Sequence, residues 1–126
     1  MAFGEGPAIL GGSALLTLAA QSLCTTAPHA VGALLDAVQW LIAGQSDDLA
    51  LEKNPKADLG DVLTMSAGKT AALMGCAAQL GALTAGATDR SVTALHSYGF
   101  ELGIAFQMID DVLGIVGDPA VTGKSA

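Results

Sequence analysis

Residues 98–116 read YGFELGIAFQMIDDVLGIV, and the fold class can be inferred from this stretch. Apolar residues recur along it at the three- and four-residue spacing of an α-helix. Gln107, Asp110, Asp111 and Gly114 stand at positions i, i+3, i+4 and i+7, so they share one helical face. Two adjacent carboxylates in apolar surroundings are costly unless they meet water, a basic partner or a divalent cation. The spacing alone leaves open both a solvated polar stripe and a site for a hard cation such as Mg²⁺.

The composition of the whole chain agrees with a helical fold. Its 126 residues fit one domain, 1–126, in which 52% of the residues are apolar and 13% are charged. Alanine and leucine, the strongest helix formers, supply most of the apolar content, while aromatic residues make up 4%. We therefore predict an all-α domain. The net charge of −7 argues against nucleic acid or an anionic membrane surface as a partner, because both need clustered Lys and Arg.

Four segments with helical periodicity follow one another, separated by short breakers. Short links place consecutive helices antiparallel, which predicts a bundle of about four long helices. A tail without periodicity, 117–126, is expected to be mobile. The predicted helices run from Pro7 to Leu23, from Ala30 to Glu52, from Asp58 or Asp61 to Ala85, and from Asp89 or Ser91 to Val116.

Several features bear on the location of the protein. The N-terminal stretch is apolar, but it carries Glu5, has no basic start and runs straight into helical pattern, so we expect no secretory signal. No uninterrupted apolar run reaches the ~18 residues of a membrane span, so we expect no transmembrane segment. Cys24 and Cys76 lie in alanine-rich segments without metal-ligand spacing, which favours two buried free thiols. A cytoplasmic protein is the expectation.

Other polar residues stand on the predicted helices. Gln45, Asp48 and Glu52 share one face, which an ordinary solvated helix end would also explain. Lys69, followed by Thr70, is embedded in the apolar segment MSAGKTAALMG (65–75), where a lysine either reaches out to water or meets an anion. Lys124 gives the tail a cation after Gly123. His29 and His96 have no acidic or cysteine partner at useful spacing and are expected at helix ends or on the surface.

Taken together, these segments resemble the trans-polyprenyl diphosphate synthases, the family of the farnesyl and geranylgeranyl diphosphate synthases. YGFELGIAFQMIDDVLGIVGDPAVTGK (98–124) resembles the second aspartate-rich region of that family. MSAGKTAAL (65–73) looks like its Lys-Thr helix, and LIAGQSDDLALE (41–52) looks like its Gly-Gln-x-x-Asp-Leu helix. AILGGSALLTLA (8–19) resembles the helix before those. The motifs stand in the family's order and cover nearly the whole chain.

The resemblance implies the isoprenoid synthase fold and the use of Mg²⁺ to bind and ionise an allylic or polyprenyl diphosphate. It implies that Asp110 and Asp111 serve the metal cluster. It assigns diphosphate binding to Lys69 and Lys124. The residues that it places around the same site are Thr70, Gln107, Gln45 and Asp48.

The sequence also departs from the family's pattern. Gly114 stands where the third aspartate of the motif is usual, and Ser13 stands where the family often has Asp. The family's first aspartate-rich helix lies upstream of anything that matches Met1, so we expect this chain alone not to condense prenyl diphosphates at an enzymatic rate. One hypothesis is a part of a prenyltransferase or terpene synthase that works as a homo-oligomer or with a complementary chain. The alternative is a non-catalytic helical interaction or regulatory subunit, or a truncated remnant of such an enzyme.

Overall fold

The computed structural model describes residues 4–117, and every regular element in that part of the chain is helical. The all-α prediction is therefore confirmed. Residues 118–126, which include Lys124 and nearly all of the tail expected to be mobile, lie outside the described residues. The elements in order are α1 (Glu5–Thr26), the short 3₁₀ turn η1 (Pro28–Ala30), α2 (Val31–Leu51), α3 (Leu59–Ser66), the π-helical turn η2 (Ala67–Ala71), α4 (Ala72–Thr84) and α5 (Asp89–Val116).

The third predicted helix corresponds to α3, η2 and α4, which follow one another without a break. Asp58 is the residue before the first turn of α3, and its Oδ1 accepts a hydrogen bond from the backbone N–H of Asp61 at 3.0 Å. Asp61 Oδ2 accepts from the backbone N–H of Asp58 at 3.1 Å, which completes a reciprocal cap. The start expected at Asp58 or Asp61 is confirmed. The π-helical turn in the middle was not predicted.

The end of α4 is set by Gly86, which follows the predicted last residue of this helix, Ala85. Its φ of +69° lies in the left-handed region, which glycine enters without steric cost. The backbone N–H of Ala87 donates to the carbonyl of Ala82, and that of Gly86 donates to Leu83. These two hydrogen bonds satisfy carbonyl groups at the end of the helix, and the chain then turns sharply toward α5.

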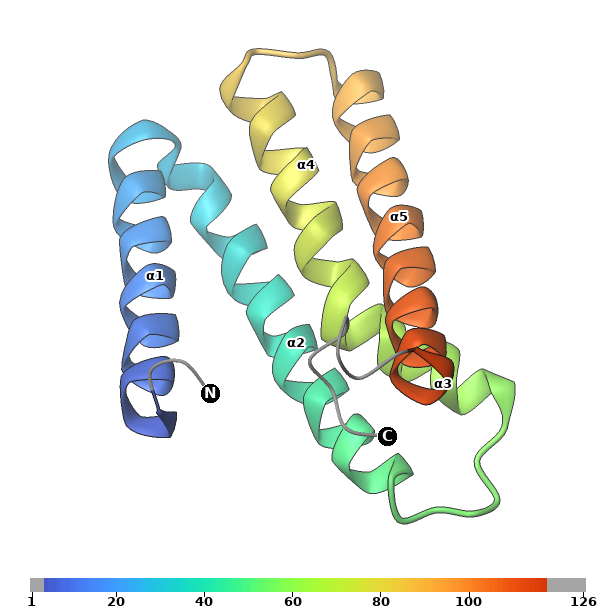
Figure 1. Cartoon of the computed structure of the whole chain (residues 1–126). Helices are drawn as coiled ribbons and strands as arrows, with labels where there is room; N and C mark the ends of the chain where they lie inside the picture. The colour runs from blue at the N-terminus through green and yellow to red at the C-terminus, as the bar shows by residue number, and fades with distance from the viewer. Residues whose placement is uncertain (1–3, 118–126) are drawn as a thin grey trace.

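Glycines allow α5 to lie beside the continuous η2–α4 helix at a very short separation (Figure 1). A Cβ placed on Gly99 of α5 would lie 2.7 Å from the carbonyl oxygen of Met74. A Cβ on Gly103 would lie 2.5 Å from Cα of Ala71. Because no side chain fits at either point, the backbones of α5 and of the η2–α4 helix pack directly against each other.

A small apolar cluster joins the first half of the chain to α4. Leu23, Ala27, Ala30 and Leu34 are buried together where α1 passes through η1 into α2. Leu80 and Leu83, near the end of α4, pack against this cluster. Leu23 is the single buried residue of α1, so that helix is held to the rest of the described chain at its C-terminal end.

By length and composition, α1 could cross a membrane, and no part of its most apolar 18-residue window is buried. This finding goes against the expectation that no segment is apolar enough for a membrane span. Glycine, serine and threonine interrupt the apolar run in α1, but they leave the mean hydropathy of the window high. The core helix of a soluble protein and an N-terminal signal sequence pass the same test.

Large apolar side chains stay exposed on α1 and on the last turns of α5, and they predict association. Exposed apolar patches of more than a few hundred Å² are uncommon in soluble monomers. We therefore expect light scattering at micromolar concentration to show a species larger than one chain, and a monodisperse monomer would contradict this. The side chains concerned include Ile9, Leu10, Leu15, Leu18, Ile115 and Val116.

Candidate functional site

The site is organised by a close crossing between α2 and η2. A Cβ on Gly44 would overlap the backbone nitrogen of Lys69. A Cβ on Gly68 would lie 2.8 Å from the carbonyl oxygen of Trp40 and 2.9 Å from Cα of Gly44. The two helices therefore touch through glycine backbones at this point. The crossing brings Lys69 beside α2, and the next residue, Thr70, faces α5.

Lys69 is bound to the polar face of α2. Its Nζ donates to Oδ2 of Asp48 at 2.6 Å, and the side chains of these two residues are 26% and 22% exposed. Gln45 donates to the same carboxylate oxygen through its Nε2 at 3.1 Å. An ammonium group has three N–H donors, and one of them is used here. Lys69 can therefore keep Asp48 as a partner while it binds a second anion from the solvent side.

Thr70 begins a second polar chain that runs into α5. Its Oγ1 donates to Oε1 of Gln107 at 2.5 Å, and Nε2 of Gln107 donates to Oδ1 of Asp111 at 2.7 Å. Gln107 is 4% exposed, and these two hydrogen bonds satisfy both the oxygen and the nitrogen of its buried amide. The two hydrogen bonds fix the orientation of the Gln107 amide, and its N–H holds one carboxylate oxygen of Asp111 in place.

The structure thus brings together most of the residues that the sequence singled out. Gln45, Asp48 and Lys69 form one hydrogen-bonded group, and Thr70, Gln107 and Asp111 form the other. The two groups meet because Lys69 and Thr70 are consecutive. Asp110 is half-buried beside Asp111 on α5. Lys124 lies outside the described residues.

An apolar trough adjoins the meeting point of the two groups. It has a volume of about 360 Å³ and is lined by Lys69, Thr70, Leu73, Met74 and Ala77. These residues follow one face of η2 and α4, so the trough runs from the polar site along the helix. Such a shape suits a ligand with a charged head and a hydrocarbon tail.

The carboxylates of Asp110 and Asp111 are suitable ligands for a Mg²⁺ ion that is also coordinated by a phosphate. Within residues 4–117, no group of three or more His, Cys, Asp or Glu side chains is placed to hold a metal ion. Mg²⁺ does not require such a cage, because it is usually bound by one or two carboxylates together with waters and substrate phosphates. A Cβ on Gly114 would meet nothing within 4 Å, so the position of the missing third aspartate is open space.

Two expectations about sulfur and histidine need correction. Cys76 is buried as predicted, but Cys24 is exposed, because on α1 it points about 100° away from Leu23, the residue through which this end of the helix packs. His96 is neither at a helix end nor fully at the surface. It is half-buried within α5, and its ring stacks on Phe100 with centroids 6.2 Å apart. Sequence periodicity missed this because it does not show which face of α5 meets α4.

The different environments of the two cysteines predict different reactivities. Burial raises the pKa of the Cys76 thiol, so it forms less of the reactive thiolate at any given pH. We expect a maleimide at neutral pH to label Cys24 at least ~10 times faster than Cys76, as followed by mass spectrometry. In a Cys24→Ser variant the fast phase should disappear, and equal labelling rates would contradict the burial of Cys76.

Comparison with known proteins adds to this geometry. The family model described as polyprenyl synthetase matches residues 1–126. A geranylgeranyl diphosphate synthase of Mycobacterium tuberculosis is 46% identical over 97% of this chain and 36% of its own length. A (2E,6E)-farnesyl diphosphate synthase of Mycobacterium bovis is 44% identical over 97% of this chain and 35% of its own length.

A solved structure agrees with the sequence comparisons. The crystal structure of a geranylgeranyl pyrophosphate synthase superimposes with a TM-score of 0.81 at 30% identity. The match covers 98% of this chain and 39% of that one. The chain spans a little more than a third of the length of the relatives that it matches. With a family model matching the full sequence and an all-α fold shared with a solved relative, the chain belongs to the polyprenyl synthetase family.

Proposed function

We propose that this chain supplies the second aspartate-rich, diphosphate-binding half of a prenyltransferase or terpene synthase site. The observation that carries the proposal is the pair Lys69–Thr70, which joins the Gln45–Asp48 group to the Gln107–Asp111 group. Lys69 and Thr70 line one end of an apolar trough, and hydrogen bonds link them to the carboxylate of Asp48 and, through Gln107, to that of Asp111. An allylic diphosphate has the matching form, with a charged head and a prenyl tail.

The described residues would bind and orient the charged head. Lys69 would donate to phosphate oxygens through the N–H groups that Asp48 does not use, and such charge-assisted hydrogen bonds are the strong ones. Asp110 and Asp111 would hold Mg²⁺, which when bound neutralises the charge of the departing diphosphate. Gln107 keeps the Asp111 carboxylate oriented. Leu73, Met74 and Ala77 would shield the tail from water.

A second candidate function is a non-catalytic helical interaction protein. The observation that favours it is the exposed apolar surface of α1 and of the end of α5, which suits a second copy or a complementary chain. In that case the polar residues would be retained without a diphosphate role. The two candidates differ in whether a diphosphate binds and whether Mg²⁺ matters.

Calorimetric titration with an allylic diphosphate distinguishes the two candidates. We expect binding with Mg²⁺ present and a loss of affinity when the metal is chelated, because Mg²⁺ bridges phosphate oxygens to carboxylates. Lys69→Met should weaken binding roughly tenfold or more, the scale of a charge-assisted contact. Lys53→Met removes an exposed cation between α2 and α3 and is the control. Binding that is indifferent to both Mg²⁺ and Lys69 would favour the interaction protein.

A further inference from the structure

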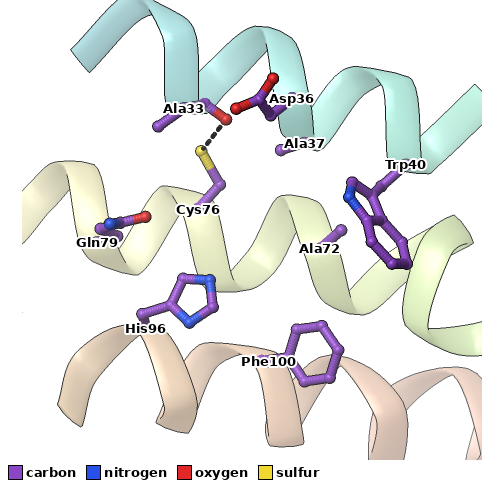
Figure 2. A pocket seen from close by; sticks show the side chains of 9 residues that line it. All are labelled: Ala33, Asp36, Ala37, Trp40, Ala72, Cys76, Gln79, His96 and Phe100. Atoms are coloured by element: carbon purple, nitrogen blue, oxygen red, sulfur yellow. Dashed lines mark hydrogen bonds between the residues drawn. The ribbon is translucent and has the colours of Figure 1, made fainter. Parts of the chain in front are cut away.

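A second hollow lies among α2, α4 and α5, and the proposed diphosphate site does not use it. It has a volume of about 440 Å³. Alanine side chains of α2 and α4 form part of its wall, and larger side chains surround them (Figure 2). The larger residues are Asp36 and Trp40 from α2, Cys76 and Gln79 from α4, and His96 and Phe100 from α5.

This hollow opens on a different side of α4 from the apolar trough. Successive residues of an α-helix are rotated by about 100°, so residues two positions apart point in nearly opposite directions. The trough uses one set of α4 residues, Leu73, Met74 and Ala77. The hollow uses the other set, Ala72, Cys76 and Gln79. The two linings share no residue, so a ligand in the hollow would not occupy the trough beside Lys69.

The lining of the hollow carries one formal negative charge and three aromatic side chains, those of Trp40, His96 and Phe100. Asp36 provides the carboxylate, and no Lys or Arg is among the lining residues. Trp40 stands one helical turn from Asp36 and is 57% exposed, so part of its indole remains open to a ligand. Asp36 and Trp40 also line an adjoining hollow of about 380 Å³. An anion would be repelled here, whereas a cation gains from the carboxylate and from the ring faces.

Two of the remaining polar groups, Cys76 and Gln79, carry no charge. The thiol of Cys76 donates to the carbonyl oxygen of Ala33 at 3.4 Å, and burial raises its pKa. It therefore stays a neutral thiol at neutral pH. Gln79 is neutral and supplies both a donor and an acceptor. His96 is held against Phe100, which gives the floor of the hollow an aromatic surface.

We propose that this hollow binds a small organic ammonium ion with a short apolar body. The cationic head would lie between the Asp36 carboxylate and the indole of Trp40. The apolar part would lie against Phe100 and the alanines of α2 and α4. Binding pockets of this kind combine apolar walls with a few polar groups that fix orientation.

Trp40 is the one tryptophan of the chain, so its fluorescence reports on this hollow and the adjoining one that it also lines. We expect choline to change that fluorescence saturably, with a dissociation constant on the order of 1 mM. The neutral analogue 3,3-dimethylbutan-1-ol has the same shape without the charge and should bind at least ~5 times more weakly. Calorimetry provides a second readout that does not depend on quenching.

Two matched variants test the assignment of the charge. Asp36→Asn should weaken choline binding roughly fivefold or more, because the carboxylate is lost while the shape is kept. Asp47→Asn removes an exposed carboxylate from the same helix outside this hollow and should leave the affinity unchanged. Lys69→Met should also leave it unchanged, so this test is independent of the diphosphate site. No saturation of either readout at tens of millimolar would overturn the proposal, as would equal binding of the neutral analogue or indifference to Asp36→Asn.

Discussion

Replacing Gly44 with alanine is expected to lower the free energy of unfolding by about 3 kcal/mol or more. The added Cβ would overlap the backbone nitrogen of Lys69 and would lie 2.5 Å from the carbonyl carbon of Gly68. These are backbone atoms, which cannot rotate away as a flexible side chain could. The helices would have to separate at their closest point. Urea unfolding followed by circular dichroism in the far ultraviolet measures the change.

The matched control for this prediction is Gly81→Ala on α4. A Cβ at Gly81 would meet nothing within 4 Å, and alanine is the better helix former. That variant should be more stable by about 0.5–1 kcal/mol, so the same substitution is expected to have opposite signs at two helical positions. If Gly44→Ala were as stable as the parent chain, α2 and η2 would not cross as described. Where Gly44→Ala still folds, diphosphate binding should weaken because the backbone of Lys69 is displaced.

Replacing Asp110 and Asp111 together with asparagine is expected to abolish the dependence of diphosphate binding on Mg²⁺. Asparagine keeps the size of each side chain but has no charge, and Mg²⁺ is held mainly by carboxylates and phosphates. The amide oxygen introduced by Asp111→Asn could still accept from Gln107, so the fold should be preserved. Calorimetric titrations with Mg²⁺ and with chelator should then give the same affinity, whereas the parent chain should differ by roughly tenfold or more.

A charge-matched control separates a metal site from a general effect of net charge. Asp89→Asn with Glu101→Gln removes two acidic groups from the same helix, α5, at positions before the polar site. This variant should keep its Mg²⁺ dependence. A Mg²⁺ response that survives in the Asp110/Asp111 variant would place the metal elsewhere, and the proposed role of these carboxylates would be wrong.

The sequence predicted the helices well because their ends are marked by local chemistry. Asp58 caps α3 through its own side chain, and Gly86 ends α4 by taking a positive φ. Asn54-Pro55 follows the end of α2, in agreement with the restriction that a proline places on the backbone of the residue before it. Signals of this kind involve residues a few positions apart, so they can be read without knowing the tertiary structure.

The site was predictable as a set of residues but not as a set of contacts. The face shared by Gln107 and Asp111 follows from helical spacing, and the structure adds a hydrogen bond between them. The Lys69–Asp48 pair spans 21 residues and depends on the crossing at Gly44, which no local pattern indicates. Spacing also could not show that Gln107 is buried, because burial depends on how closely α5 approaches α4.

The π-helical turn Ala67–Ala71 lets one long helix meet two neighbours at different rotational phases. A π turn holds one residue more than an α turn between hydrogen-bonded groups, and one residue corresponds to about 100° of helical rotation. The phase of α3 is fixed by its contact with α2, and the phase of α4 is fixed by its glycine contact with α5. The extra residue absorbs the mismatch between these two phases. Deleting one residue from this turn would force a single rotational phase on the whole helix. Lys69 could then no longer bind Asp48 on α2 while Thr70 binds Gln107 on α5.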